Sequence, residues 1–217
     1  YHNERNAGVP ASLSTQVPVG LHVGHGVKQI STEKVHVTGN LQNTGNDLDI
    51  SIDGAGFFQI LQPNGIIAFS RDGHFNIDGQ GRLVTNDGMP IDPEINIPVD
   101  TRKVEISNDG TVSVFLRDET QPEAIGSIQL ARFQNPAGLT PIGKNLYVST
   151  PASGNAVLDS PAANGMGGLN QGFLEGSNVS LVEEMVNMIT AQRAYEVNSK
   201  AIQSSDEMLK TANGLIR

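Results

Sequence analysis

The chain has 217 residues, a formal net charge of −9 at neutral pH and no cysteine. An acidic chain disfavours nucleic acid and anionic lipid surfaces, so no nucleic-acid partner is expected. The lack of cysteine excludes disulfides and thiolate metal sites. No stretch approaches the ~20 apolar residues of a membrane span, so no membrane insertion is expected. With 24 Gly and 5% aromatic residues, the chain should contain many turns and a modest core.

Residues 1–45 are expected to form an extended or β connecting region. They mix Gly, Pro, Ser and Thr with short β-prone pieces, and Lys34–Thr38 alternates polar and apolar side chains as a strand does. The chain begins at Tyr1 without methionine or a recognisable leader. We therefore expect a trimmed or processed chain with further sequence upstream.

Residues 46–133 are predicted to form an antiparallel β domain. Turn dipeptides that supply positive φ angles recur through the segment. Asp-Gly occurs at 53–54, 72–73, 78–79, 87–88 and 109–110, and Asn-Gly at 64–65. Seven short strands are expected between such turns: Phe57–Leu61, Ile66–Ser70, His74–Ile77, Arg82–Thr85, Val104–Ser107, Thr111–Leu116 and Gly126–Phe133. This spacing is typical of a sandwich or barrel-like domain, with proline-rich residues 88–100 as a connector or an edge.

Residues 134–177 are predicted to be the C-terminal part of the connecting region. Leu146–Ser149 and Leu169–Leu174 are strand candidates. Pro151–Gly168 is rich in Gly, Ala, Ser, Asn and Pro, which favours an exposed flexible loop.

Residues 178–217 are predicted to form one long helix with an apolar seam. An apolar residue returns at every seventh position, which is typical of a helix that packs against other helices. The expected assembly seam is Leu181, Met185, Met188, Tyr195, Ile202, Leu209 and Ile216. At ~1.5 Å per residue the helix would span roughly 54 Å, too long for one face of a small domain. We therefore expect it to belong to an assembly, although a bundle helix within one chain is the simpler alternative.

The start of this helix carries a capping signal. Ser180 followed by Glu183 fits a capping box, in which the hydroxyl accepts a hydrogen bond from the first turn. Asn178 is a competing cap. Glu183 and Glu184 lie in the first turn, where acidic groups interact favourably with the helix dipole.

Candidate chemical sites are weak. His22 and His25 could bind a metal, but no third ligand is near in sequence, so loop histidines are the preferred interpretation. Asp47, Asp49 and Asp53 could act as an acid–base pair, but alternation assigns them to the solvated face of a strand. No nucleophile–base arrangement is singled out, so we expect no catalytic residue, no metal and no cofactor.

Gly56-Phe57-Phe58 allows two interpretations. Phe57 and Phe58 could contact a neighbouring subunit, or they could pack in the core of the β domain. Core packing is the preferred interpretation, because large aromatic side chains are most often buried.

Several segments resemble the bacterial flagellar axial proteins, the family of rod, hook and hook-associated subunits. The helix segment from Ser177 to Ile202 is very similar to that family's C-terminal helix, and Gly172-Phe-Leu-Glu-Gly matches its usual lead-in. In the β region, Ile52-Asp-Gly-Ala-Gly-Phe-Phe-Gln-Ile, Ser70-Arg-Asp-Gly-His-Phe and Gly81-Arg-Leu-Val-Thr look like the family's hairpin motifs. The likeness covers nearly the whole chain. Within the family it is nearest to distal rod members, because of its size and because residues 1–26 resemble theirs.

The resemblance implies a structural subunit rather than an enzyme. It would polymerise helically into a rigid hollow shaft that transmits torque from motor to hook across the periplasm. The implied partners are copies of the chain itself, proximal rod proteins, the hook protein, the bushing rings of the basal body and the flagellar type III export apparatus. An N-terminal helix upstream of Tyr1 would pair with the C-terminal one. Alternatives are a proximal rod or hook protein, a secreted β domain that binds a surface ligand and oligomerises by its helix, and, ranked lowest, a β-sandwich hydrolase.

Overall fold

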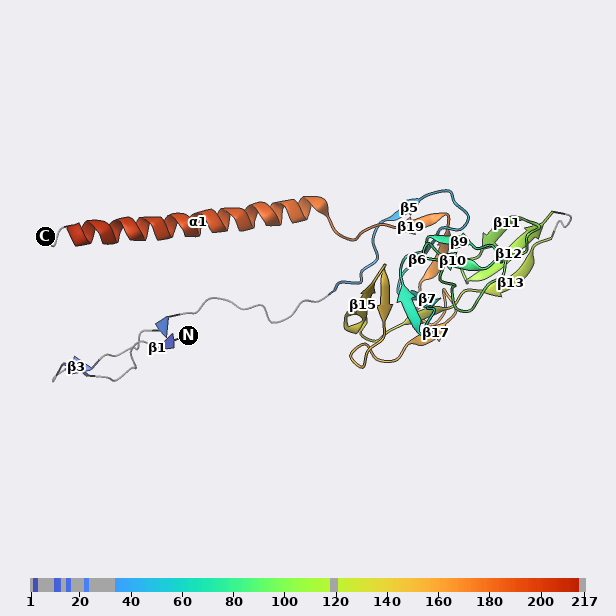
Figure 1. Cartoon of the computed structure of the whole chain (residues 1–217), viewed down its shortest axis with the longest axis horizontal. Helices are drawn as coiled ribbons and strands as arrows, with labels where there is room; N and C mark the ends of the chain where they lie inside the picture. The colour runs from blue at the N-terminus through green and yellow to red at the C-terminus, as the bar shows by residue number, and fades with distance from the viewer. Residues whose placement is uncertain are drawn as a thin grey trace. The chain divides into compact units, whose positions relative to one another are not determined.

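A computed structural model gives the fold of the chain (Figure 1). It describes residues 34–117 and 121–214, with side chains as far as residue 211, and the backbone of 2–3, 10–12, 15–16 and 22–23. The chain divides into two units, Tyr1–Val35 and His36–Arg217. In the first unit, β1 (His2–Asn3) pairs with β4 (His22–Val23), and β2 (Pro10–Ser12) pairs with β3 (Thr15–Gln16).

The largest sheet of the second unit has six antiparallel strands in the order β15-β16-β8-β7-β14-β17. Its strands are β15 (Thr140–Gly143), β16 (Leu146–Val148), β8 (Ile67–Ser70), β7 (Phe57–Leu61), β14 (Leu130–Arg132) and β17 (Val157–Asp159). β7 and β8 form a hairpin around Asn64-Gly65. Gly65 has a φ of +79°, which glycine adopts at low cost.

Smaller antiparallel sheets complete this unit. β11 (Thr101–Ile106), β12 (Thr111–Leu116) and β13 (Glu123–Ser127) form a three-stranded sheet. Three two-stranded sheets pair β9 (Phe75–Ile77) with β10 (Leu83–Thr85), β6 (Ile50–Asp53) with β18 (Gly168–Gln171), and β5 (Leu41–Asn43) with β19 (Phe173–Glu175). A 3-10 turn, η1, covers Pro136–Gly138.

Two hydrophobic cores hold these sheets together. The larger core contains Phe58, Ile60 and Phe75, and the smaller core contains Phe57 and a group of aromatic and apolar neighbours. Central strand β7 therefore contributes to both cores, because successive side chains point to opposite faces of a sheet. Residues 57 to 60 of β7 are all buried, which explains why this strand lacks polar alternation.

The predicted fold class is confirmed in its main part. The second unit is built largely of antiparallel strands and ends in one long helix, α1 (Leu181–Gly214). The barrel-like alternative is wrong, because no sheet in the described part of the chain closes on itself. Residues 88–100 contain only isolated bridges, as expected of a connector. Ile91, Ile95 and Ile97 nevertheless anchor this connector in the larger core.

Several predicted strands differ in the structure. Lys34–Thr38 is not a strand, and the His36 ring instead packs edge-on against Phe57 and Tyr147. Gly126–Phe133 divides into β13 and β14, because Ile128 leaves the three-stranded sheet and enters the larger core. Leu169–Leu174 divides at Gly172, whose φ of +79° cannot continue a strand.

The predicted flexible loop at Pro151–Gly168 is also wrong in part. Val157–Asp159 forms edge strand β17, and the side chains of Ser153 and Met166 are buried. Ser153 accepts and donates hydrogen bonds within its own turn, and Met166 packs in the larger core. Composition alone hides such local packing, because small polar residues suit both loops and tight turns.

Candidate assembly surface

Helix α1 begins directly after Ser180. The Ser180 Oγ accepts a hydrogen bond from the backbone N–H of Glu183 at 3.4 Å, and the Ser180 carbonyl accepts one from Glu184 at 3.0 Å. Asn178 donates its side-chain amide to the carbonyl of Val37 at 3.0 Å. Of the two predicted cap residues, Ser180 therefore has the geometry of a cap. Asn178 instead links two segments, the one before the helix and the one around Val37.

The side chains of α1 are exposed along its whole described length. Over residues 181–211, only Ser199 is half-buried, and all others are exposed. The predicted seam residues in this range are 60–77% exposed: Leu181, Met185, Met188, Tyr195, Ile202 and Leu209. Ile216 lies outside the described residues. In globular proteins, an exposed apolar row of this length usually marks a surface that another protein covers.

Other apolar side chains of α1 are exposed outside this row: Val182, Val186, Ile189, Val197 and Met208. Some lie on the opposite side of the helix, as Val197 does from Tyr195, since each residue turns the helix by about 100°. We therefore call only the seam row the apolar stripe of α1. The structure brings the stripe together along one helix and, within residues 34–211, buries none of it under another element. The arrangement suits packing against other helices and offers no chemistry for catalysis.

The exposed stripe leads to a prediction about the isolated chain. In a dilute monomer we expect α1 and the residues beyond it, 179–217, to be partly frayed, because tertiary packing supplies most helix stability in proteins. Native-state hydrogen exchange should show fast exchange along this segment and slow exchange in β7. Strong protection throughout residues 179–217 in dilute monomer would contradict this expectation.

Phe57 and Phe58 lie inside the second unit. Phe57 is 4% exposed, and its ring meets those of Phe133 and Tyr147 edge-on at 5.9 and 6.3 Å. Phe58 is fully buried and meets Phe75 at 5.2 Å. Both side chains fill the cores, so in this conformation neither is available on the surface for a neighbouring subunit.

The aspartates near β6 behave differently from one another. Asp47 and Asp53 are exposed, as expected, but the solvated position predicted for Asp49 is wrong. The Asp49 carboxylate accepts hydrogen bonds from Thr44 Oγ1 and Asn46 Nδ2 at 2.5 and 3.1 Å and lies 2.6 Å from His74 Nδ1. The burial of this carboxylate is compensated by these hydrogen bonds, which connect the turn before β6 to the residue before β9. The pairing joins residues 25 apart in sequence, so no local pattern could reveal it.

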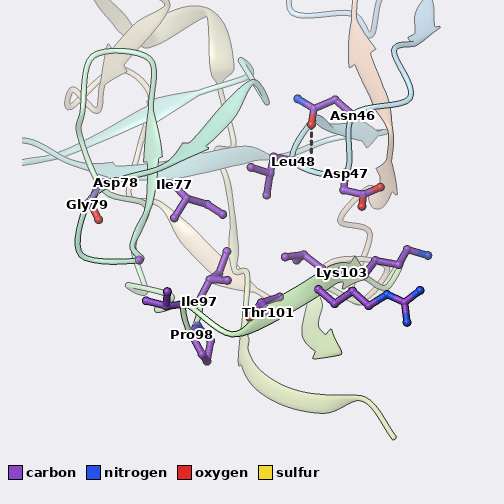
Figure 2. Close-up of a pocket in the computed structure, with 14 residues that line it drawn as sticks. Asn46, Asp47, Leu48, Ile77, Asp78, Gly79, Ile97, Pro98, Thr101 and Lys103 are labelled. Atoms are coloured by element: carbon purple, nitrogen blue, oxygen red, sulfur yellow. Dashed lines mark hydrogen bonds between the residues drawn. The ribbon is translucent and has the colours of Figure 1, made fainter. Parts of the chain in front are cut away.

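A surface groove of about 560 Å³ lies between the turn before β6, the β9–β10 hairpin and the start of β11. Figure 2 shows Leu48, Ile77 and Ile97 around one hollow, with Lys103 at its edge. Its fourteen lining residues include no Ser, Cys or His. The groove could accept an apolar group beside a cation.

Two carboxylates beside turns are held ionised by their neighbours. The backbone N–H of Arg82 donates to Asp78 at 2.9 Å, and this bond, with others from Gln80 and the Arg82 guanidinium, lowers the pKa of Asp78. The Asn164 side-chain amide lowers the pKa of Asp159 in the same way. Both are turn-stabilising interactions, because each carboxylate bonds to backbone amides of its own turn.

The described side chains do not group into a metal site of three or more His, Asp or Glu residues. The predicted pair His22 and His25 lies outside the residues whose side chains are described. Within the described part of the chain, no helix combines the length and apolarity needed to cross a membrane.

Comparison with known proteins draws these features together. Residues 170–215 match the family described as "Flagellar basal body rod FlgEFG protein C-terminal", and residues 51–114 match "Flagellar hook protein FlgE/F/G D1 domain". The two matched regions meet in the structure where β18 pairs with β6. Both descriptions include rod and hook proteins, so these two matches do not distinguish a rod protein from a hook protein. The full-length relatives make that distinction.

Full-length relatives are named rod proteins. The chain is 48% identical over 215 residues to the flagellar basal-body rod protein FlgG of Buchnera aphidicola subsp. Acyrthosiphon pisum, covering 99% of this chain and 83% of that protein. It is 49% identical to FlgG of Buchnera aphidicola subsp. Schizaphis graminum, with the same coverage. It is 47% identical to FlgG of Borreliella burgdorferi, covering 100% of this chain and 83% of that protein. The chain belongs to the FlgG family of flagellar basal-body rod proteins.

FlgG membership confirms the family resemblance predicted from the helix and hairpin motifs. The C-terminal profile extends over all of α1, so the apolar stripe from Leu181 to Leu209 is part of the matched region. The same region includes Ser180 and Glu183 at the helix start.

Proposed function

We propose that this FlgG-family chain is a structural subunit of the distal rod of the bacterial flagellum. Many copies would polymerise helically into a rigid hollow shaft that carries torque from the motor to the hook. The observation that supports this most directly is the apolar stripe, which is exposed on a helix of 34 residues in a chain whose relatives are basal-body rod proteins.

The energetics of the stripe suit an assembly. Burying the six heptad residues from Leu181 to Ile216 could contribute roughly 9–18 kcal/mol, at ~1.5–3 kcal/mol for each side chain. Association costs about 4–15 kcal/mol in lost translational and rotational freedom. A single helix pair is therefore marginal, whereas contacts with several neighbours in a helical polymer would give a stable shaft.

The proposed partners follow from this position in the flagellum. Copies of the chain would pack on the apolar stripe, with proximal rod proteins below, the hook protein above and the bushing rings around the shaft. Export through the flagellar type III apparatus suits a chain without cysteine, because no disulfide has to form before transport. The function needs no catalytic residue and no cofactor.

Electron microscopy of basal bodies from a host that lacks this gene tests the proposal. A distal rod subunit should leave rods that stop short and carry no hook, and the wild-type gene supplied in trans should restore both. Complete basal bodies with hooks in the deletion strain would refute the proposal. Rods of full length without hooks would indicate a role beyond the distal rod, at the hook itself.

A further inference from the structure

Two segments of the second unit lie side by side between the β domain and the rest of the chain. We call residues 37–43 and 173–178 the connector pair. β5 and β19 pair within it, Gly176 donates its N–H to the Asn40 carbonyl at 2.8 Å, and Asn178 reaches the Val37 carbonyl. At Gly39 the contact is so close that an added Cβ would lie 2.0 Å from the Gly176 carbonyl oxygen. Only glycine at position 39 allows this approach.

A single arginine joins the connector pair to the β domain. Arg71 Nη1 donates to the carbonyls of Gly54 and Gly56 at 2.7 and 2.8 Å. Its Nε and Nη2 both lie 2.9 Å from Glu175 Oε2, and Nη2 also donates to Thr38 Oγ1 at 3.3 Å. The guanidinium therefore contacts the β domain and both members of the connector pair at once.

Glu175 completes the arrangement with its second oxygen. Glu175 Oε1 accepts a hydrogen bond from the backbone N–H of Gly39 at 2.9 Å. The Arg71 side chain is 19% exposed and that of Glu175 is 13% exposed. The Arg71 guanidinium also lies 5.9 Å from the centre of the Phe57 ring, so it packs on the smaller core. Partial burial with full hydrogen bonding is the situation in which an ion pair fixes geometry most strongly.

The chemistry requires arginine at this position. A planar guanidinium carries five N–H donors in a rigid fork, whereas lysine offers a point charge that cannot reach four acceptors in these directions. Among the arginines that the structure describes, Arg82 also forms ion pairs with carboxylates, but these are Asp78 and Glu94 within the β domain and not residues of the connector pair. Arg82 is therefore a matched control.

We propose that Arg71 is a positioning residue that, with Glu175, locks the connector pair onto the β domain. Because of this lock, the β domain turns together with the rod core. This inference rests on the proposed rod function. In the described part of the chain, α1 follows residues 173–178, so torque applied to α1 reaches the β domain along the chain through one segment of the connector pair. A lock at that point prevents the β domain from swivelling when the shaft is loaded.

Hydrogen exchange on the purified full chain tests the lock without relying on rod function. In Arg71→Lys, amides of residues 39–43 and 173–176 should exchange about tenfold faster or more, because charge-assisted bonds across the joint are lost. Amides of β12 should be unchanged, which shows that the domain still folds. Arg82→Lys should leave the connector pair unchanged. If Arg71→Lys does not fold, Glu175→Gln, which keeps the side-chain shape, should show the same loss of protection. Unchanged protection in the folded variant would overturn the proposal.

Swimming under load tests the mechanical role. Cells with Arg71→Lys should build basal bodies with hooks of normal appearance but lose at least about half of their swimming speed in viscous medium relative to Arg82→Lys cells. If Arg71→Lys loses hydrogen-exchange protection in the connector pair but the cells swim normally under load, the proposed role of Arg71 in torque transfer would be overturned. If the gene deletion itself leaves rods intact, the rod function fails instead, and the hydrogen-exchange result on the joint stands apart from it.

Discussion

Replacing Tyr195 by proline should abolish rod assembly and swimming while the β domain stays folded. Proline in a helix interior removes one backbone hydrogen bond and clashes with the preceding turn, at a cost of about 3 kcal/mol or more. Tyr195 lies near the middle of α1 and is 77% exposed, so no core packing is lost in the monomer. The break would interrupt the apolar stripe halfway along its length. Electron microscopy of basal bodies and motility in soft agar measure the effect, and thermal unfolding measures the β domain.

Arg193 supplies the control for this variant. Two residues from Tyr195, it lies on nearly the opposite side of the helix, since each residue turns the helix by about 100°. Arg193→Ala keeps the helix and leaves the apolar stripe complete, so cells that carry it should assemble rods. Tyr195→Pro cells that still build rods and swim would show that the shaft does not depend on a continuous α1.

Replacing Phe58 by alanine should destabilise the β domain by about 3–5 kcal/mol, as for other fully buried phenylalanines. Phe58 is 0% exposed and packs edge-on against Phe75, so the change leaves a cavity in the larger core. Small domains have unfolding free energies of about 5–15 kcal/mol, so the variant would be close to unfolding at physiological temperature. Urea titration of the purified chain, followed by circular dichroism, gives the change in unfolding free energy.

A residue on the neighbouring hairpin turn shows whether the effect comes from burial. Ile66 is 51% exposed beside the β7–β8 turn, and Ile66→Ala should change stability by no more than about 0.5 kcal/mol. Equal losses in the two variants would contradict the assignment of Phe58 to the core. A stable Phe58→Ala monomer that fails only in assembly would favour the other interpretation of this motif, a contact between subunits.

Strands marked by local turn chemistry could be predicted well from the sequence. β7 and β12 have the predicted bounds, because Asn64-Gly65 and Asp109-Gly110 fix the turns beside them. Helix α1 was also predictable, because its seven-residue repeat is long and a cap residue precedes it. In each case the decisive interaction lies within a few residues along the chain.

The interactions that organise the candidate site could not be predicted in this way. Arg71 and Glu175 are 104 residues apart, and Asn178 and Val37 are 141 apart. Asp49 looks like a solvated strand residue until His74 is seen beside it. Such pairs depend on tertiary folding, which brings distant polar groups together. The hydrogen bonds between these groups offset the free energy lost when they leave water. One sequence shows the residue types but not these partners.

The seven-residue spacing of the stripe also bears on the handedness of the shaft. An α-helix has 3.6 residues per turn, so a strict seven-residue repeat drifts by about 20° per heptad around a straight helix. The four heptads from Leu181 to Leu209 therefore drift by about 80°. Helices that keep such a stripe against their neighbours must wrap in a left-handed sense. Twisting the shaft one way would tighten this winding and twisting it the other way would loosen it. A drive shaft built on α1 would thus be stiffer in one direction of rotation than in the other.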